Sequence, residues 1–204
     1  LFDRLLTNTQ FKSDFIQGFA AHLNSTFTPE RVISMMNEMS SEIETEMEKD
    51  VVRWDNHTTN GGSGCSPINS MDQWRSHLAI MENFAKLRPD IIRQQLSDKF
   101  GLTGSVQLDF SSDGGSITLN GVENVQSGQY FTGIPIRLTA VPDIGYEFIG
   151  WDGLDGDNQI EFLATEDQAI TAIFAPSGES ILPAHITEDL ILSKKDSPYL
   201  ASSD

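Results

Sequence analysis

One loop of the sequence places a thiol near an imidazole. Cys65 is the single cysteine of the chain, and His57 precedes it by eight residues within the polar, glycine-rich stretch 55–70. Such a pair can act as a nucleophile when the imidazole takes the thiol proton. A glycine-rich loop holds that geometry poorly, and no Asn or Asp is specified to orient the imidazole. We therefore expect an exposed, inert thiol, with the nucleophile pair as the alternative.

A second group of candidate ligands lies in an acidic turn, where Asp152, Asp155 and Asp157 are followed by Glu161. Carboxylate oxygens are the ligands that Ca²⁺ prefers, but the spacing lacks the register and the final bidentate glutamate of an EF-hand loop. We expect a plain acidic turn, with calcium binding as the alternative.

The remaining histidines are His22, His77 and His185. None of them forms an i, i+4 pair with another ligand type, so we expect each to be a structural or surface residue.

Aromatic side chains offer a third kind of chemistry, stacking on sugars. Tyr130, Phe131 and Trp151 are the candidates for such a surface. A small β fold has few other large residues to bury, so we expect Tyr146, Phe148 and Trp151 to form its core instead. No catalytic, cofactor-binding or metal-binding residue is assigned, and no cofactor is expected in this chain.

The composition narrows the possible partners. The chain has 204 residues and a formal net charge of −17, from 13 Lys and Arg against 30 Asp and Glu. Binding to nucleic acid or to an anionic membrane needs local positive charge, so neither partner is expected. One cysteine allows no intrachain disulfide, and no apolar run approaches the roughly 18–20 residues of a membrane span.

The charge and the hydrophobic period both change near residue 103. Residues 1–103 have a net charge of −4, whereas residues 104–176 have a net charge of −10 with Arg137 as their single basic residue. Helix-type spacing of apolar residues gives way at the same point to strand-type alternation. Such a coincident change is typical of a domain boundary.

The first hundred residues are patterned as helices. Apolar residues recur at three- and four-residue intervals from Phe11 to Phe27, and Thr28-Pro29 then supplies a cap and a first helical residue. The long helix that follows has a stripe that we expect to be packed core, with a promiscuous methionine-rich groove as the alternative. Its members are Val32, Met36, Met39, Ile43, Met47 and Val51.

A later helix is predicted to begin at the cap Ser70 and to carry Trp74. Pro89 is expected to divide it from a short final helix, which Gly101 ends. The ordered landmarks of this half resemble the C-terminal helical part of the CotH family, the atypical kinases that are similar to spore coat protein H. They are Leu1-Phe2-Asp3-Arg4-Leu5-Leu6, Phe11-Lys12-Ser13-Asp14-Phe15, Arg53-Trp54, Trp74 and Phe84-Ala85-Lys86-Leu87-Arg88-Pro89.

The CotH resemblance, over about residues 1–102, implies that the catalytic Asp and the nucleotide- and metal-binding carboxylates lie upstream of these helices. Nothing in this chain matches those residues. The helical half has no Asp-x-Asp pair, no glycine-rich phosphate loop and no lysine on a strand. We therefore find no complete active site, and whether the parent protein is an enzyme stays open.

From Gly104 onward apolar and polar residues alternate. Turn signals such as Asn120-Gly121 separate the alternating runs, and the spacing predicts six or seven short strands in a sandwich or barrel. Within this region Tyr146 and Phe148 are expected on one side of a strand, with Trp151 just beyond a bend at Gly150.

The same region, about residues 104–175, closely resembles the bacterial repeat domain called the divergent InlB B-repeat. The landmarks are Gly128-Gln129-Tyr130-Phe131-Thr132-Gly133, Ile136-Arg137-Leu138-Thr139-Ala140-Val141-Pro142, Gly145-Tyr146-Glu147-Phe148-Ile149-Gly150-Trp151 and Ile170-Thr171-Ala172-Ile173-Phe174. This resemblance implies a non-catalytic spacer or interaction module of a secreted or surface protein. Gly145, Tyr146, Phe148, Gly150 and Trp151 are its structural motif.

The predicted fold class is α+β in two tandem domains, an all-α segment at 1–102 and a small all-β sandwich or barrel-like module at 104–175. Residues 176–204 are expected to be a linker or the start of a further β module, and the interface at the joint is expected to be small. Both ends look cut from a longer chain.

The functional prediction is a non-catalytic fragment of an extracellular or cell-surface bacterial protein, whose β module is a spacer, adhesion or interaction domain. Its partners would be an unidentified protein or glycan and the flanking modules of the parent chain. The alternative is part of a CotH-like Ser/Thr kinase whose ATP and metal site lies upstream.

Overall fold

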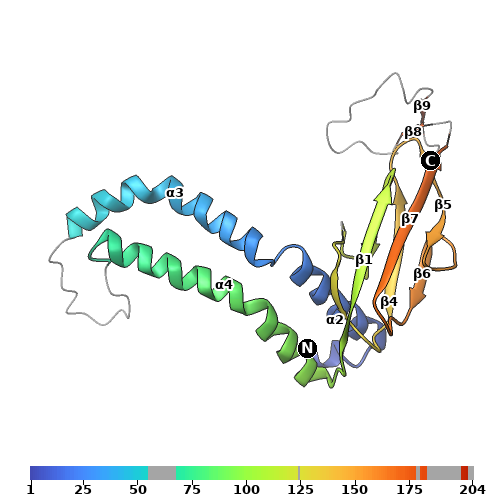
Figure 1. Ribbon diagram of the computed structural model, residues 1–204, viewed down its shortest axis with the longest axis horizontal. Helices are drawn as coiled ribbons and strands as arrows, with labels where there is room; N and C mark the ends of the chain where they lie inside the picture. The colour runs from blue at the N-terminus through green and yellow to red at the C-terminus, as the bar shows by residue number, and fades with distance from the viewer. Residues whose placement is uncertain (55–67, 124, 178–179, 183–198, 202–204) are drawn as a thin grey trace. The chain divides into compact units, whose positions relative to one another are not determined.

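The protein has a helical N-terminal part and a C-terminal β region with two small sheets, which confirms the predicted fold class (Figure 1). Two compact units make up the chain: Leu1–Ser25 with Leu96–Asp204, and Thr26–Gln95. Helical residues therefore belong to both units. The computed structural model describes residues 1–54, 68–123, 125–177, 180–182 and 199–201.

The helix α2 (Thr9–Asn24) follows the short helix α1 (Phe2–Leu5). The Oδ1 atom of Asn8 accepts a hydrogen bond of 2.9 Å from the backbone N–H of Phe11, which satisfies one amide group of the first turn. One face of α2 is buried. It consists of Ile16, Gln17, Gly18, Ala20, Ala21 and Leu23.

The long helix α3 (Pro29–Trp54) begins as predicted, because the Thr28 hydroxyl accepts a bond of 3.4 Å from the Arg31 N–H. Its apolar stripe is less buried than predicted. Met39 is 65% exposed and Ile43 is 50% exposed, so the expectation of a packed core is wrong at these positions. A helix that packs on one neighbour can cover only one side of a wide apolar stripe.

The helix α4 (Met71–Phe100) confirms both of its predicted ends. The Ser70 hydroxyl accepts a hydrogen bond of 3.1 Å from the Gln73 N–H at its start. Gly101 follows its last residue with φ at +65°, in the left-handed region that glycine adopts without strain.

The predicted break at Pro89 is wrong, because α4 continues through it. A proline inside a helix lacks the N–H that would bond back to the preceding turn. The buried stripe of α4 runs on across this position, with Ala85 before the proline and Leu96 after it. Packing of one continuous stripe therefore outweighs the single lost hydrogen bond.

The described β region contains seven strands between residues 105 and 176, in line with the six or seven that the alternation predicted. They are β1 (Ser105–Asp113), β2 (Gly115–Leu119), β3 (Gly128–Phe131), β4 (Ile136–Pro142), β5 (Tyr146–Asp152), β6 (Gln159–Phe162) and β7 (Gln168–Pro176). One sheet has the order β3-β1-β7-β5, and the other has the order β2-β4-β6. Strands β1 and β7 are parallel, whereas the other pairs within these two sheets are antiparallel.

The core of the β region follows the alternation of its strands. On β4, for example, Ile136, Leu138 and Ala140 are buried, whereas Arg137 and Thr139 point the other way. Complete burial of one Leu or Ile side chain stabilises the fold by roughly 1.5–3 kcal/mol. The other large buried members are Val106, Leu108, Ile117, Leu119, Tyr130, Phe131, Trp151 and Ile170.

The turn predicted at Asn120-Gly121 is also confirmed. Asn120 has φ at 46° and Gly121 has φ at 83°, and the two residues lie between the paired residues Leu119 and Val122. Two successive residues with positive φ are the geometry that an Asn-Gly pair tolerates best.

Two further strands lie in the region predicted as a linker or the start of another β module. Strand β8 (Ser180–Leu182) pairs in parallel with β9 (Tyr199–Ala201). The remaining residues of 178–204 lie outside the described part of the chain.

Candidate interaction site

The predicted aromatic motif lies on β5 and divides into an inner and an outer part. Trp151 is 9% exposed, and its Nε1–H donates a hydrogen bond of 2.8 Å to the backbone oxygen of Asp157. The Phe148 ring lies 5.4 Å from the Trp151 ring and 5.9 Å from the Phe174 ring, measured between centroids. Tyr146, in contrast, is 38% exposed at the start of the strand.

A β-bulge explains how Phe148 and Trp151 can meet. Residues three apart on a regular strand point to opposite faces of the sheet. The pairing of β5 with β7 shifts between Phe148 and Gly150, which leaves Ile149 as an extra residue. The two aromatic rings consequently lie on the same side, and Ile149 is 57% exposed. Gly145, just before the strand, has φ at +86°.

The sugar-stacking alternative is wrong, because all three of its candidates, Tyr130, Phe131 and Trp151, are buried. Tyr130 and Phe131 lie on β3 with exposed fractions of 0% and 3%. The Tyr130 hydroxyl donates a hydrogen bond of 2.8 Å to the backbone oxygen of Gln126. The ring faces of Tyr130 and Phe131 are therefore covered by other residues of the protein and cannot stack on a sugar.

The candidate ligand groups do not form a metal site in the described part of the chain. No three His, Cys, Asp or Glu side chains come together there in the manner of metal ligands, and the acidic turn of Asp152, Asp155, Asp157 and Glu161 is included in that finding. His22 and His77 are exposed on helices. Cys65, His57 and His185 lie outside the described residues, so the inert thiol stays a prediction and the thiol–imidazole pair stays its alternative.

The most extensive polar site of the described residues joins α2 to the β region. Gln17 is completely buried on α2. Its Nε2–H group donates to the backbone oxygens of Phe131 at 2.8 Å and Ile134 at 3.0 Å, and its Oε1 atom accepts from the Phe131 N–H at 3.2 Å. One amide side chain thus satisfies three backbone groups next to the end of β3.

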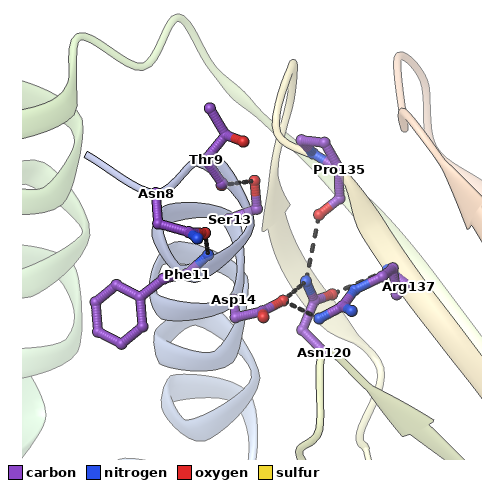
Figure 2. Close-up of polar contacts among 8 residues, drawn as sticks. All are labelled: Asn8, Thr9, Phe11, Ser13, Asp14, Asn120, Pro135 and Arg137. Carbon is purple, nitrogen blue, oxygen red and sulfur yellow. Dashed lines mark hydrogen bonds and ion pairs between the residues drawn. The ribbon is translucent and has the colours of Figure 1, made fainter. Parts of the chain in front are cut away.

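A second polar group holds the same two elements together (Figure 2). The Asp14 carboxylate on α2 forms an ion pair with the guanidinium of Arg137 on β4, and it also accepts a hydrogen bond of 2.9 Å from the Asn120 side chain. Asn120 in turn accepts a bond of 3.0 Å from the Arg137 N–H. Arg137 is the single basic residue between positions 104 and 176, and it is used to bind a helix.

We call these five residues, Asp14, Gln17, Asn120, Phe131 and Arg137, the clasp. The expectation of a small interface is wrong at α2, which packs against β2, β3 and β4. Sequence reasoning missed the clasp because its partners are more than 100 residues apart. One signal was present: Gln17 is a polar residue between Ile16 and Ala20 on an otherwise apolar helix face.

Among the described residues, no helix combines the length and the apolar character that a bilayer crossing needs. No curated protein and no solved structure matches the chain.

Two family models do match, one to each half. Residues 1–92 match the family described as CotH kinase protein, and residues 107–178 match the divergent InlB B-repeat domain. These matches confirm the resemblances that the helix landmarks and the β motifs indicated. The chain therefore carries a CotH kinase segment followed by a divergent InlB B-repeat domain.

Proposed function

We propose that this chain is a non-catalytic part of a secreted or cell-surface bacterial protein, in which the β module serves as a spacer that positions neighbouring modules. The InlB B-repeat match supports a surface role. The clasp is the observation that carries the spacer role, because it packs α2, a helix of the CotH segment, and the β module into one compact unit. In that unit Gln17 is fully buried and satisfies three backbone groups.

The adhesion role is the variant of this proposal that needs an exposed ligand surface on the β module. Its acidic outer surface and the half-exposed Tyr146 are available for contact with a protein or glycan. A glycan array probed with the full chain, together with its tryptophan fluorescence, separates the two roles. For a spacer we expect no glycan bound on the array and no change in tryptophan fluorescence. A bound glycan would contradict the spacer role.

A CotH-like Ser/Thr kinase is the second candidate, and the match of residues 1–92 is the observation that favours it. The resemblance implies that the ATP and metal ligands of such a kinase would lie upstream of these helices. Calorimetric titration of the full chain with ATP and Mg²⁺ or Mn²⁺ tests the non-catalytic proposal. We expect no binding, and micromolar ATP affinity would overturn it.

The surface location is tested separately in the bacterium that makes the parent protein. An antibody against the β module should label intact cells or the culture medium. Labelling that requires cell lysis would contradict the surface role while leaving the spacer role untouched.

A further inference from the structure

Asn120 belongs to one of the two Asn-Gly pairs of the sequence, and the other pair is Asn60-Gly61. Glycine has no side chain, so its backbone nitrogen can approach the side-chain carbonyl carbon of a preceding asparagine unhindered. That attack closes a succinimide ring and expels the side-chain nitrogen as ammonia. Water then opens the ring to aspartate or isoaspartate, so the net change replaces an amide by a carboxylic acid.

The clasp holds the reactive amide of Asn120 in place (Figure 2). Its Nδ2–H group donates to the Asp14 carboxylate at 2.9 Å and to the Pro135 backbone oxygen at 3.4 Å. Its Oδ1 atom accepts from the Arg137 N–H at 3.0 Å. Asn120 is also only 9% exposed. Both polar atoms of the amide are therefore bound to neighbouring residues, and little of the residue meets solvent.

The backbone on which the attack depends is held as well. Leu119 and Val122 exchange two hydrogen bonds, of 2.9 and 2.8 Å, on either side of Asn120 and Gly121. The Gly121 nitrogen therefore lies within a tight two-residue turn. To reach that nitrogen, the Asn120 side chain has to leave its partners on α2 and β4. Deamidation in the folded chain consequently depends on a local opening of the clasp.

The product of deamidation does not fit the clasp. The Nδ2–H donor is replaced by a carboxylate oxygen, which faces two acceptors, the Asp14 carboxylate and the Pro135 oxygen. Two carboxylates at hydrogen-bond distance repel each other, and the Arg137 guanidinium already pairs with that of Asp14. Isoaspartate in addition lengthens the backbone of the turn. A deamidated clasp therefore closes less favourably than the original one.

We propose that Asn120 is a deamidation site controlled by the clasp, and that its deamidation permanently weakens the attachment of α2 to the β module. Opening of the clasp frees the amide for attack by the Gly121 nitrogen. The reaction consumes water, releases ammonia and needs no enzyme. It is a one-way change, so the fraction of deamidated chains records how long the clasp has been open. This holds whether the β module is a spacer or an adhesion domain.

Peptide mapping by mass spectrometry on the full chain tests the control by the clasp. In urea, which unfolds the chain, Asn120 and Asn60 should deamidate at similar rates, because both precede a glycine. Without urea, Asn120 should react at least about tenfold more slowly than it does in urea. Equal rates of Asn120 in the two conditions would overturn the proposal.

Asp14→Ala removes the ion pair with Arg137 and one hydrogen bond of Asn120, and it leaves the turn sequence intact. Deamidation of Asn120 in the folded variant should be about fivefold faster than in the wild-type chain. Asp3→Ala removes an exposed carboxylate from α1 and is the matched control, with an unchanged rate. A rate that does not respond to Asp14→Ala would overturn the role of the clasp.

Asn120→Asp reproduces one product of the reaction and tests whether the attachment of α2 is weakened. The Phe131 N–H donates to Gln17 on α2, so its amide exchange reports on that attachment. The exchange should be at least about fivefold faster in Asn120→Asp than in the wild-type chain. Asn37→Asp makes the same change at an exposed position of α3 and should leave it unaltered. Equal exchange in Asn120→Asp and the wild-type chain would overturn the permanent weakening.

Discussion

Gln17 and Phe131 are 114 residues apart and exchange two hydrogen bonds, with Gln17 Nε2–H donating to the Phe131 oxygen at 2.8 Å and the Phe131 N–H donating to Gln17 Oε1 at 3.2 Å. This exchange resembles one step of a β ladder, with a side chain in the place of a strand. The α2 helix belongs to the CotH segment, yet these bonds make it a structural part of the compact unit Leu1–Ser25 with Leu96–Asp204. We call this unit the β unit.

Replacing Gln17 by Leu should destabilise the β unit strongly. The substitution places an apolar side chain at this position of α2 and removes the bonds of Gln17 to the buried backbone groups of Phe131 and to the half-buried Ile134 oxygen. We expect a loss of about 3 kcal/mol in the free energy of unfolding. Urea unfolding monitored by circular dichroism measures it, with Gln95→Leu on the exposed surface as the control. Equal stability of the two variants would show that the bonds of Gln17 contribute little.

The ion pair between Asp14 and Arg137 should contribute less than Gln17, because both side chains are about one-third exposed. A double-mutant cycle with Asp14→Asn and Arg137→Met should give a coupling energy of about 1 kcal/mol at low salt. The coupling should shrink as salt is added, since ions screen partly exposed charges. A coupling of zero at low salt would rule out an energetic role for the pair.

Deletion of Ile149 should be tolerated, although it removes a residue from a strand. Ile149 is the extra residue of the bulge, so the rings of Phe148 and Trp151 keep the same side without it. We expect a change in the free energy of unfolding within about 1 kcal/mol.

The matched control for that deletion is the removal of Thr139 from β4. There the buried Leu138 and Ala140 flank the deleted residue, so one of them must turn to solvent. We expect a loss of more than about 3 kcal/mol or complete unfolding. Thermal unfolding followed by near-ultraviolet circular dichroism compares the two chains, and similar losses in both would contradict the account of the bulge.

Pro89→Ala should stabilise α4. The alanine restores an N–H inside a continuous helix and should raise the free energy of unfolding of the unit Thr26–Gln95 by about 1–3 kcal/mol. Amide exchange on α4 measures the gain. The neighbouring exposed substitution Asp90→Ala should change it by less than about 0.5 kcal/mol. A neutral or destabilising Pro89→Ala would indicate that the proline fits a kink that the packing requires.

Local patterns predicted the elements of this fold well. The Thr28-Pro29 start of α3 and the Asn120-Gly121 turn depend on neighbouring residues only, and so does the alternation on β4. The continuity of α4 through Pro89 was not predictable in this way, because it depends on the burial of Ala85 and Leu96 by residues from elsewhere.

The clasp lay beyond sequence reasoning for a related physical reason. A buried glutamine can form hydrogen bonds with any nearby backbone N–H and C=O groups. The sequence does not indicate which groups these are. The pairing of β1 with β7 joins two distant segments in the same way. Charge, in contrast, carried a usable signal, because Arg137 is a single cation among eleven acidic residues of 104–176 and it pairs with a carboxylate of α2.

Whether α2 is part of the β unit is tested most directly by amide exchange of the β core in the full chain and in a chain that lacks residues 1–25. The reporters are the backbone amides of Leu108, Leu138 and Ile170, which are completely buried and lie on three different strands. Loss of α2 should speed their exchange by at least about tenfold, which corresponds to about 1.4 kcal/mol. Unchanged exchange in the shortened chain would contradict the account and show that residues 104–175 fold without the helix.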